Sequence, residues 1–258
     1  GVEVRVMYDD MGCLPLLPEN YQKYLESLNI KCVVFNKLKM FKGIFMNNRD
    51  HRKITVIDGN IAYTGGLNLS DEYINKKIKY GYWKDNAIKL QGNSVWNLTI
   101  MFLSLWNSYK KEDKDYLKFK TTDNLKIKPN GYLSAYASVP INGVLEGEDV
   151  YLNIINKATK YVYIITPYLI IDTDMINSII LAFKRGVDVR IVIPGIPDKK
   201  SAYYLAKTYY PTLLASGVKI YEYTPGFVHA KVFVSDNSRA VVGTINLDYR
   251  SLYHHFEC

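Results

Sequence analysis

Short apolar runs separated by polar segments recur along the chain and predict a mixed α/β fold. Residues 2–8, 162–166 and 187–193 form nearly continuous apolar runs, which are typical of strands buried on both faces of a sheet. The same pattern predicts further strands at 33–35 and 219–223, helices at 95–106, 149–160 and 174–185, and crossover helices at 19–29 and 199–216, the last disturbed at Pro211.

A repeat organises these elements. The stretch "HRKITVIDGNIAYTGGLN" begins at His51, and "HAKVFVSDNSRAVVGTIN" begins at His229; each is typical of a strand, a turn and a second strand. Upstream of them, "GVEVRVMYDD" at Gly1 matches "GVDVRIVIPG" at Gly186. The two pairs have slightly different offsets, which indicates a short insertion or deletion. The simplest interpretation is two copies of one α/β unit.

The two copies are not equally complete. The second is preceded by a helix, a strand and another helix that have no counterpart before Gly1. The first continues past Asn68 to the apolar stretch "VWNLTIMFLSLW", whereas the second stops at Cys258. We therefore expect a piece of a longer pseudo-dimeric protein, truncated at both ends. Because the charged stretch between the copies ends in proline, the predicted division is a first lobe at 1–109, a linker at 110–130 and a second lobe at 131–258.

Composition adds three constraints. A chain of 258 residues, 48% of them hydrophobic, is long enough for one large or two smaller cores. Three cysteines, an odd number without zinc-site spacing, indicate a reducing compartment and no disulfide framework. The net charge of +8 favours anionic partners such as phosphates, nucleic acid or an anionic lipid surface. Neither a membrane-spanning run of ~20 apolar residues nor an N-terminal signal peptide is recognisable.

The repeated polar positions carry the candidate chemistry. In each copy a lysine follows the histidine by two positions, so on a strand both side chains leave the same face. An aspartate ends that strand, and an asparagine follows at the expected start of a helix. The resulting candidates are His51, Lys53, Asp58 and Asn68 in the first copy and His229, Lys231, Asp236 and Asn246 in the second.

These residue types suit phosphodiester chemistry when the two copies meet at one pocket. One histidine attacks phosphorus and the other protonates the leaving oxygen, while lysine and asparagine donors hold the non-bridging oxygens. Such a site needs no metal and no cofactor. The alternative is that the histidines are structural. However, a decayed repeat that kept only its core would retain valine and isoleucine rather than histidine, lysine and asparagine.

The two motifs resemble the H-x-K-x4-D motif of the phospholipase D superfamily, followed by G-(G/S/T)-x-N, and they match it completely in both copies. The resemblance implies an α/β fold of two tandem phospholipase D-like α/β/α lobes forming a pseudo-dimer, one shared site and a phosphohistidine intermediate. Within the superfamily the chain resembles bacterial cardiolipin synthases, through stretches such as "NNRDHRKITVIDG", "YEYTPGFVHAKVFVSD" and "GTINLDYRSLYHHFE" that together cover nearly the whole sequence.

The resemblance also implies residue roles. His51 and His229 are expected to be nucleophile and acid, with His51 assigned as the nucleophile. Phosphate-binding roles fall to Lys53, Lys231, Asn68 and Asn246. A downstream carboxylate is expected to orient each histidine, namely Asp85 in "YWKD" for His51 and Glu257 in "HHFEC" for His229. Asp58 and Asp236 are expected to support them, and His254 and His255 to be structural.

The implied activity is transfer of a phosphatidyl group between two phosphatidylglycerol molecules, giving cardiolipin and glycerol. The implied partners are phosphatidylglycerol and an anionic membrane surface rather than nucleic acid, with the lobes on the cytoplasmic side of a bacterial cell membrane. Two alternatives stay open: a hydrolase that uses water (a phospholipase D or an endonuclease), and an inactive lipid- or DNA-binding module. A basic groove with stacking aromatics favours nucleic acid, and an apolar funnel beside the phosphate site favours lipid.

Overall fold

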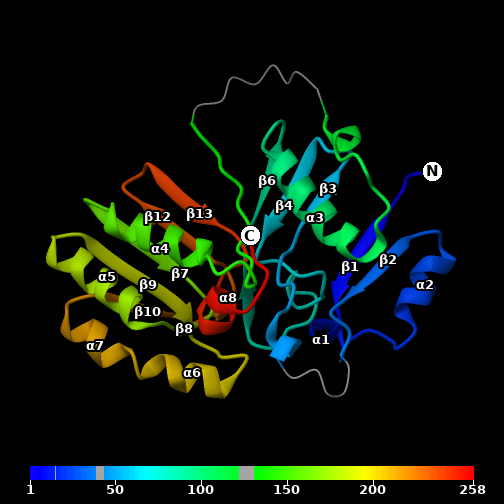
Figure 1. Cartoon of the computed structure of the whole chain (residues 1–258). Coiled ribbons are helices and arrows are strands. Elements are labelled where there is room, and N and C mark those ends of the chain that lie inside the picture. Colours follow the sequence, from blue (N-terminus) through cyan, green and yellow to red (C-terminus); the bar gives the residue numbers. More distant parts are fainter. Residues whose placement is uncertain (15, 39–43, 122–130) are drawn as a thin grey trace.

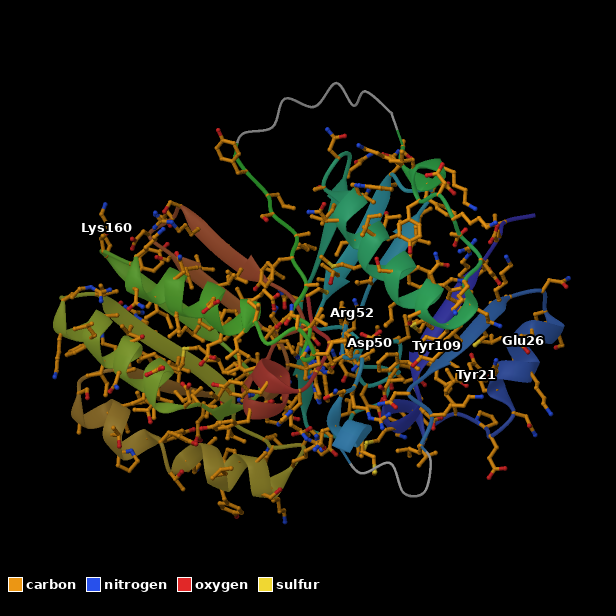
Figure 2. All side chains as sticks on the ribbon, viewed as in Figure 1. Tyr21, Glu26, Asp50, Arg52, Tyr109 and Lys160 are labelled. Carbon is orange, nitrogen blue, oxygen red and sulfur yellow. The ribbon has the colours of Figure 1, made fainter. Side chains whose placement is uncertain are left out.

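The computed structural model describes residues 1–14, 16–38, 44–121 and 131–258. Figure 1 shows two groups of elements side by side, with the earlier part of the chain in one group, the later part in the other and the C-terminus between them. In Figure 2, Glu26 and Lys160 lie at opposite ends of the molecule, and Asp50 and Arg52 lie between them. The predicted mixed α/β fold is confirmed.

The later half is built on a five-stranded sheet in the order β10-β9-β7-β12-β13. Strands β7, β9 and β10 are parallel, and β12 runs antiparallel to both β7 and β13. Helices α4, α5 and α7 pack against the sheet and against one another, and their apolar faces join its buried side chains in one core. The bounds are α4 Glu146–Asn156, β7 Tyr161–Ile165, α5 Thr173–Lys184, β9 Asp188–Pro194, α7 Tyr210–Ala215, β10 Lys219–Tyr223, β12 Val232–Ser235 and β13 Arg239–Val242.

The other face of this sheet is only half-buried, so the expectation of strands buried on both faces is wrong here. Buried and half-buried residues alternate along β7 and along most of β9. On the half-buried face Tyr163 stacks on Tyr161, and the Arg190 guanidinium lies 4.9 Å from the Tyr163 ring centre. Tyrosine made the run look fully apolar, but its hydroxyl keeps that face polar enough to meet water.

The earlier half contains the counterparts of these strands in two smaller sheets. Strands β1 (Arg5–Asp9) and β2 (Lys31–Phe35) are connected through α2 (Tyr21–Ser27) and pair in parallel. Their counterparts β9 and β10 also pair in parallel. The hairpin of β3 (Thr55–Ile57) and β4 (Ile61–Gly65) corresponds to β12 and β13, and it pairs with β6 (Ala87–Gln91). Helix α3 (Val95–Lys110) covers this sheet, and Val95 and Leu98 share its core with Ala62 and Leu90. Within the described residues no strand equivalent to β7 joins the two sheets.

Backbone pairing joins the two halves directly. Strand β5 (Tyr82–Lys84) runs parallel to β11 (Gly226–Val228). A Cβ on Gly226 would lie 2.3 Å from the Tyr82 carbonyl oxygen, so only glycine allows this approach. Near the C-terminus, Phe256 bridges to Asp50. The remaining elements are α1 Asp10–Cys13, η1 Ile44–Asn47, η2 Leu117–Phe119, β8 Leu169–Ile170, α6 Lys200–Lys207, β14 Leu247–Asp248 and α8 Tyr249–Tyr253.

The expected linker, residues 110–130, is only partly described by the structure. Residues 111–121 of the expected linker pack on the earlier half, where Asp113 pairs with Arg5 and Thr121 donates to the Asp58 carbonyl at 2.6 Å. Residues 122–130 lie outside the described residues, so the division into lobes and linker stays a prediction.

Helices α6 and α7 replace the single helix expected at 199–216, with Pro211 in the first turn of α7. None of the helices in the described ranges is both long and apolar enough to cross a bilayer.

Candidate active site

His51 lies in an extended segment just before β3, paired with the last residues of the chain. Its N–H donates to the Phe256 carbonyl at 3.0 Å, and the Phe256 N–H donates to the Arg49 carbonyl at 2.8 Å. This pairing brings the Glu257 carboxylate to the imidazole, with Oε1 and Oε2 at 2.9 Å and 3.0 Å from Nδ1 of His51. The contact fixes the tautomer, because Nδ1–H donates to the carboxylate and leaves the lone pair on Nε2.

His229 has an equivalent position between β11 and β12. Its N–H donates to the Lys84 carbonyl at 2.7 Å, as a continuation of the β5–β11 pairing. The next residue along the earlier half, Asp85, places Oδ2 at 2.8 Å from Nδ1 of His229. Each histidine therefore has a carboxylate on Nδ1, which leaves the lone pair on Nε2.

The pairing of carboxylates and histidines is the reverse of the sequence expectation. Glu257 was expected to orient His229 and Asp85 to orient His51, but Glu257 contacts His51 and Asp85 contacts His229. The reason is the crossing of the chain between the halves: the C-terminal segment lies beside residues 49–51, and β5 lies beside β11. Each histidine–carboxylate pair therefore combines one residue from each half.

The two pairs differ in what holds the carboxylate. Thr244 donates its hydroxyl to Oε2 of Glu257, whereas Gly66 occupies the equivalent motif position of the first copy. A Cβ on Gly66 would lie 2.1 Å from Oδ1 of Asp85, so no hydroxyl side chain fits there. Asp85 Oδ1 instead accepts the Asn86 N–H at 2.8 Å.

The pKa values of the two carboxyls shift in opposite directions. Burial disfavours the charge on Glu257, but His51 and His255 outweigh it and hold the Glu257 pKa well below its usual range. At Asp85 burial dominates over the attraction of Lys231 and the Asn86 N–H, so the Asp85 pKa is raised. The carboxylate beside His51 is thus the more firmly ionised.

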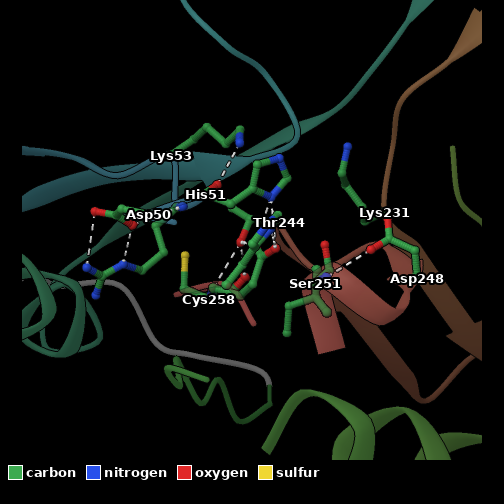
Figure 3. A network of polar contacts seen from close by, with 12 residues as sticks. Asp50, His51, Lys53, Lys231, Thr244, Asp248, Ser251 and Cys258 are labelled. Atoms are coloured by element: carbon green, nitrogen blue, oxygen red, sulfur yellow. Dashed lines mark hydrogen bonds and ion pairs between the residues drawn. The ribbon is translucent and has the colours of Figure 1, made fainter. Parts of the chain in front are cut away.

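Both motif lysines fold back over their own histidine. Lys53 Nζ donates to the His51 carbonyl at 2.6 Å, and Lys231 donates to the His229 carbonyl. Lys231 Nζ also lies 3.0 Å from Nε2 of His229. A phosphate oxygen bound by Lys231 would consequently lie beside the reactive nitrogen. Figure 3 shows the His51 ring between Lys53 and Lys231.

Burial and the lysine charges keep both imidazoles neutral near pH 7. Burial lowers the pKa of His51 to about 4, against the opposing effect of Glu257. For His229, burial and then the charges of Lys231, Lys53 and His51 lower the pKa well below its usual value. That His51 and Lys53 act on His229 places the two motifs in one electrostatic environment.

Lys231 sets the expected alkaline limit of activity. Burial, against the attraction of Asp85, lowers the pKa of Lys231 to about 7. The charge is present below this pKa and is lost as pH rises through it, so kcat/KM for a p-nitrophenyl phosphodiester, whose leaving group needs no proton, is expected to fall above pH 7. On the acid side kcat/KM is expected to fall near pH 4, where His51 gains its proton. Because arginine keeps its charge, Lys231→Arg should move the alkaline limb upward; a limb that stays near 7 would assign it to another group.

Of the motif asparagines, Asn68 is linked to His229 through Tyr73, and the two motif aspartates lie in turns. Asn68 donates to the Tyr73 hydroxyl at 2.5 Å. Asn246 is buried, and its Oδ1 has no hydrogen-bond partner among the described residues. Asp58 and Asp236, motif candidates that were expected to support the orienting carboxylates, lie instead in the turns that follow β3 and β12, both with positive φ. This is a correction, and its reason is distance along the strand: each aspartate comes at the far end, away from its histidine.

Asp236 holds the start of β7. Its carboxylate accepts the backbone N–H groups of Thr159, Lys160 and Tyr161 at 2.8–2.9 Å, and these bonds hold its pKa far below the usual range. Asp236→Ala is therefore expected to lower the melting temperature by a few degrees while kcat changes less than about twofold. Thermal denaturation and steady-state kinetics of the variant test this; a large loss of kcat in a protein of unchanged stability would contradict it.

Several residues around the histidines were missed or set aside at the sequence level. Tyr73 packs edge-on against His229 with ring centres 5.2 Å apart, and Trp83 lies 5.4 Å from the same ring. Neither belongs to the repeat, so no sequence signal marks them. His255, expected to be structural, places Nδ1 at 3.6 Å from Oε1 of Glu257. The donor atoms of His51, His255 and Glu257 lie within 4.8 Å of one another, close enough to hold a metal ion.

Comparisons with known proteins agree with the fold. A family model described as "Cardiolipin synthase, PLD-like domain" matches residues 151–258. Over the whole chain, an uncharacterized protein of Streptococcus mutans is 54% identical and a cardiolipin synthase of Halalkalibacterium halodurans is 35% identical, and the chain covers 56% and 51% of them. The chain thus spans about half the length of the curated relatives it matches. The crystal structure of a phosphatidylserine synthase from Haemophilus influenzae has the same fold, with a TM-score of 0.62, 15% identity and coverage of 98% of this chain and 68% of that one.

Proposed function

We propose that the chain, which matches a PLD-like family model over residues 151–258 and is similar along its whole length to bacterial cardiolipin synthases, carries the site of a phosphatidyltransferase that makes cardiolipin. The observation that carries the proposal is the crossed pairing of His51 with Glu257 and of His229 with Asp85. It gives one site two imidazoles with the lone pair on Nε2 and two lysines for a phosphate.

His51 is the proposed nucleophile. Its carboxylate partner Glu257 is firmly ionised and receives the Thr244 hydroxyl, so the imidazole is held in place and made more basic at Nε2. The His51 side chain is 23% exposed, against 7% for His229, which gives an incoming phosphorus better access to it. Nε2 attacks phosphorus, the new P–N bond replaces the bond to the leaving glycerol oxygen, and a phosphohistidine results.

His229 is the proposed acid and base. A bound phosphodiester anion offsets the charges of Lys231 and Lys53 that lower the pKa of His229, and so favours the protonated form that donates to the leaving glycerol. The neutral imidazole then accepts a proton from the hydroxyl of a second phosphatidylglycerol. That oxygen attacks phosphorus and the P–N bond breaks, giving cardiolipin. Because one phosphodiester replaces another, no external energy source is required.

The site offers four side-chain donors for the non-bridging oxygens. Lys53 and Lys231 lie against the two histidines, and Asn68 and Asn246 complete the set. Fixed donors of this kind stabilise the charge that grows on phosphoryl oxygens in the transition state. In the full-length protein, we infer an anionic membrane at the cytoplasmic side as the source of both lipid substrates.

The test is a reaction with phosphatidylglycerol, labelled in its glycerol headgroup, as the only phospholipid. Cardiolipin and free glycerol in equal amounts, resolved by thin-layer chromatography and mass spectrometry, are the expected products. Phosphatidic acid without cardiolipin would instead make the protein a hydrolase. If no lipid is converted but single- or double-stranded DNA is cleaved, the lipid assignment is wrong and the phosphodiester chemistry remains.

A further inference from the structure

The segment that follows β4 and ends at the first residue of β5, residues 67–82, exposes an unusual number of large apolar side chains. We call it the 67–82 loop. Aliphatic residues of soluble proteins are mostly buried, and exposed apolar clusters commonly mark interaction surfaces. Here the exposed fractions are 37% for Leu67, 107% for Leu69, 68% for Ile74, 76% for Ile78 and 55% for Tyr82.

Basic side chains lie next to the exposed apolar side chains of the 67–82 loop. Lys76, Lys77 and Lys79 are exposed and flank Ile78. The ion pair between Lys76 and Asp71 spans 3.7 Å and is itself open to solvent, so it leaves the lysine charge available. Lysines beside exposed aliphatic residues are the composition of segments that lie in the interface of a bilayer, where lysine reaches the headgroups and the apolar side chains reach the acyl chains.

The base of the 67–82 loop belongs to the active site. Tyr73 accepts a hydrogen bond from Asn68 and packs edge-on against His229. Asn75 is fixed by two bonds to the backbone of Trp83, one of 2.7 Å to its N–H and one of 3.0 Å to its carbonyl. The loop is therefore held at the catalytic histidine while its apolar side chains face outward.

We propose that the 67–82 loop docks on an anionic phospholipid bilayer, with Leu69, Ile74 and Ile78 entering the interface and the lysines binding lipid phosphates. This proposal rests on the proposed function, for which it supplies the membrane contact beside the site. The exposed side chains favour a bilayer over nucleic acid, because single strands are held by aromatic stacking, whereas four of the five exposed apolar residues here are aliphatic. Charge complementarity with anionic headgroups supplies the attraction.

Vesicle flotation tests the proposal, using phosphatidylcholine vesicles with or without phosphatidylglycerol. Lys76→Gln/Lys77→Gln/Lys79→Gln is expected to weaken binding to the anionic vesicles about a hundredfold, since each lysine near such a surface contributes about fivefold. Leu69→Ser/Ile78→Ser is expected to weaken it at least about tenfold by removing apolar insertion. The matched controls are Lys157→Gln/Lys160→Gln/Lys184→Gln and Leu181→Ser/Leu214→Ser, which change exposed residues of other elements and should bind like the unaltered protein.

Turnover of a monomeric short-chain phosphatidylglycerol separates this proposal from the proposed function. The loop variants are expected to keep that turnover within about twofold and to lose turnover of vesicle substrate. If they bind anionic vesicles as well as the controls do, the docking surface is refuted, whatever the activity. If binding depends on the loop but neither substrate is converted, docking stands and the synthase assignment falls. Loop-dependent binding to DNA or RNA without binding to vesicles would also overturn the proposal.

Discussion

His51→Ala is expected to form no covalent phosphoenzyme and to lose at least ~10³-fold in activity. His229→Ala is expected to keep the first half-reaction, the formation of the phosphohistidine, under one condition. That condition is a p-nitrophenyl phosphodiester substrate, whose leaving group needs no proton. With it, His229→Ala should still release a burst of p-nitrophenol and retain phosphate on His51, because only the acid is missing. With a glycerol leaving group both variants should be inactive. Stopped-flow absorbance and mass spectrometry of the trapped protein measure the two steps.

His254→Ala is the matched control, because His254 is exposed and lies three residues from Glu257. It is expected to keep both the burst and the turnover. If His229→Ala loses the burst and His51→Ala keeps it, the two roles are exchanged and His229 is the nucleophile. If both variants keep full activity, neither histidine is catalytic and the proposed mechanism is wrong.

The second large effect is expected at the crossed carboxylates. Glu257→Gln keeps the shape of the side chain but removes the charge that orients His51 through the contacts of 2.9 Å and 3.0 Å, so kcat should fall ~10²- to 10⁴-fold. Because this loss is in the nucleophilic step, the p-nitrophenyl leaving group should not restore the burst. Asp85→Asn acts on His229 at 2.8 Å, and there the same leaving group should restore most of the burst.

The comparison of these two variants also tests which carboxylate serves which histidine. Pairing within each half would give the opposite pattern, with a burst restored in Glu257→Gln and absent in Asp85→Asn. Thr244→Val is a useful third variant because it removes the hydroxyl on Glu257 without touching either histidine. It is expected to impair the burst in the same direction as Glu257→Gln, by a smaller factor.

The sequence by itself was enough to indicate the family and the histidines, lysines and asparagines that are proposed for the site. The repeat is the informative feature. A repeat that was kept only for its hydrophobic core would not retain histidine, lysine and asparagine at the same spacing in both copies. Local spacing also predicted the hairpins after His51 and His229 and the break at Pro211, because these depend on neighbours along the chain. Both lysines indeed lie over their own histidine, as a separation of two positions in an extended segment requires.

Local spacing misled where one residue type has two roles. Asp58 and Asp236 belong to the motif as firmly as the histidines do, but they end strands and, in the case of Asp236, bind the backbone at 159–161. The alternating burial of β7 was also hidden, because tyrosine counts as apolar in a sequence pattern while Tyr161 and Tyr163 lie on the half-buried face. In both cases the sequence shows which residue is present, but only the structure shows what surrounds it.

Only the tertiary structure decided which carboxylate meets which histidine. In a repeat, Asp85 and Glu257 are each compatible with either partner, since the sequence separation within a copy carries no information on contacts between copies. The pairing depends on the parallel contact of β5 with β11 and on the C-terminal residues beside 49–51, which are backbone contacts between distant parts of the chain. The sequence shows that Gly66 and Thr244 differ at equivalent motif positions, but only the packing shows that the Thr244 hydroxyl donates to Glu257. The opposite pKa shifts of Glu257 and Asp85 likewise depend on burial and on neighbours from distant parts of the chain.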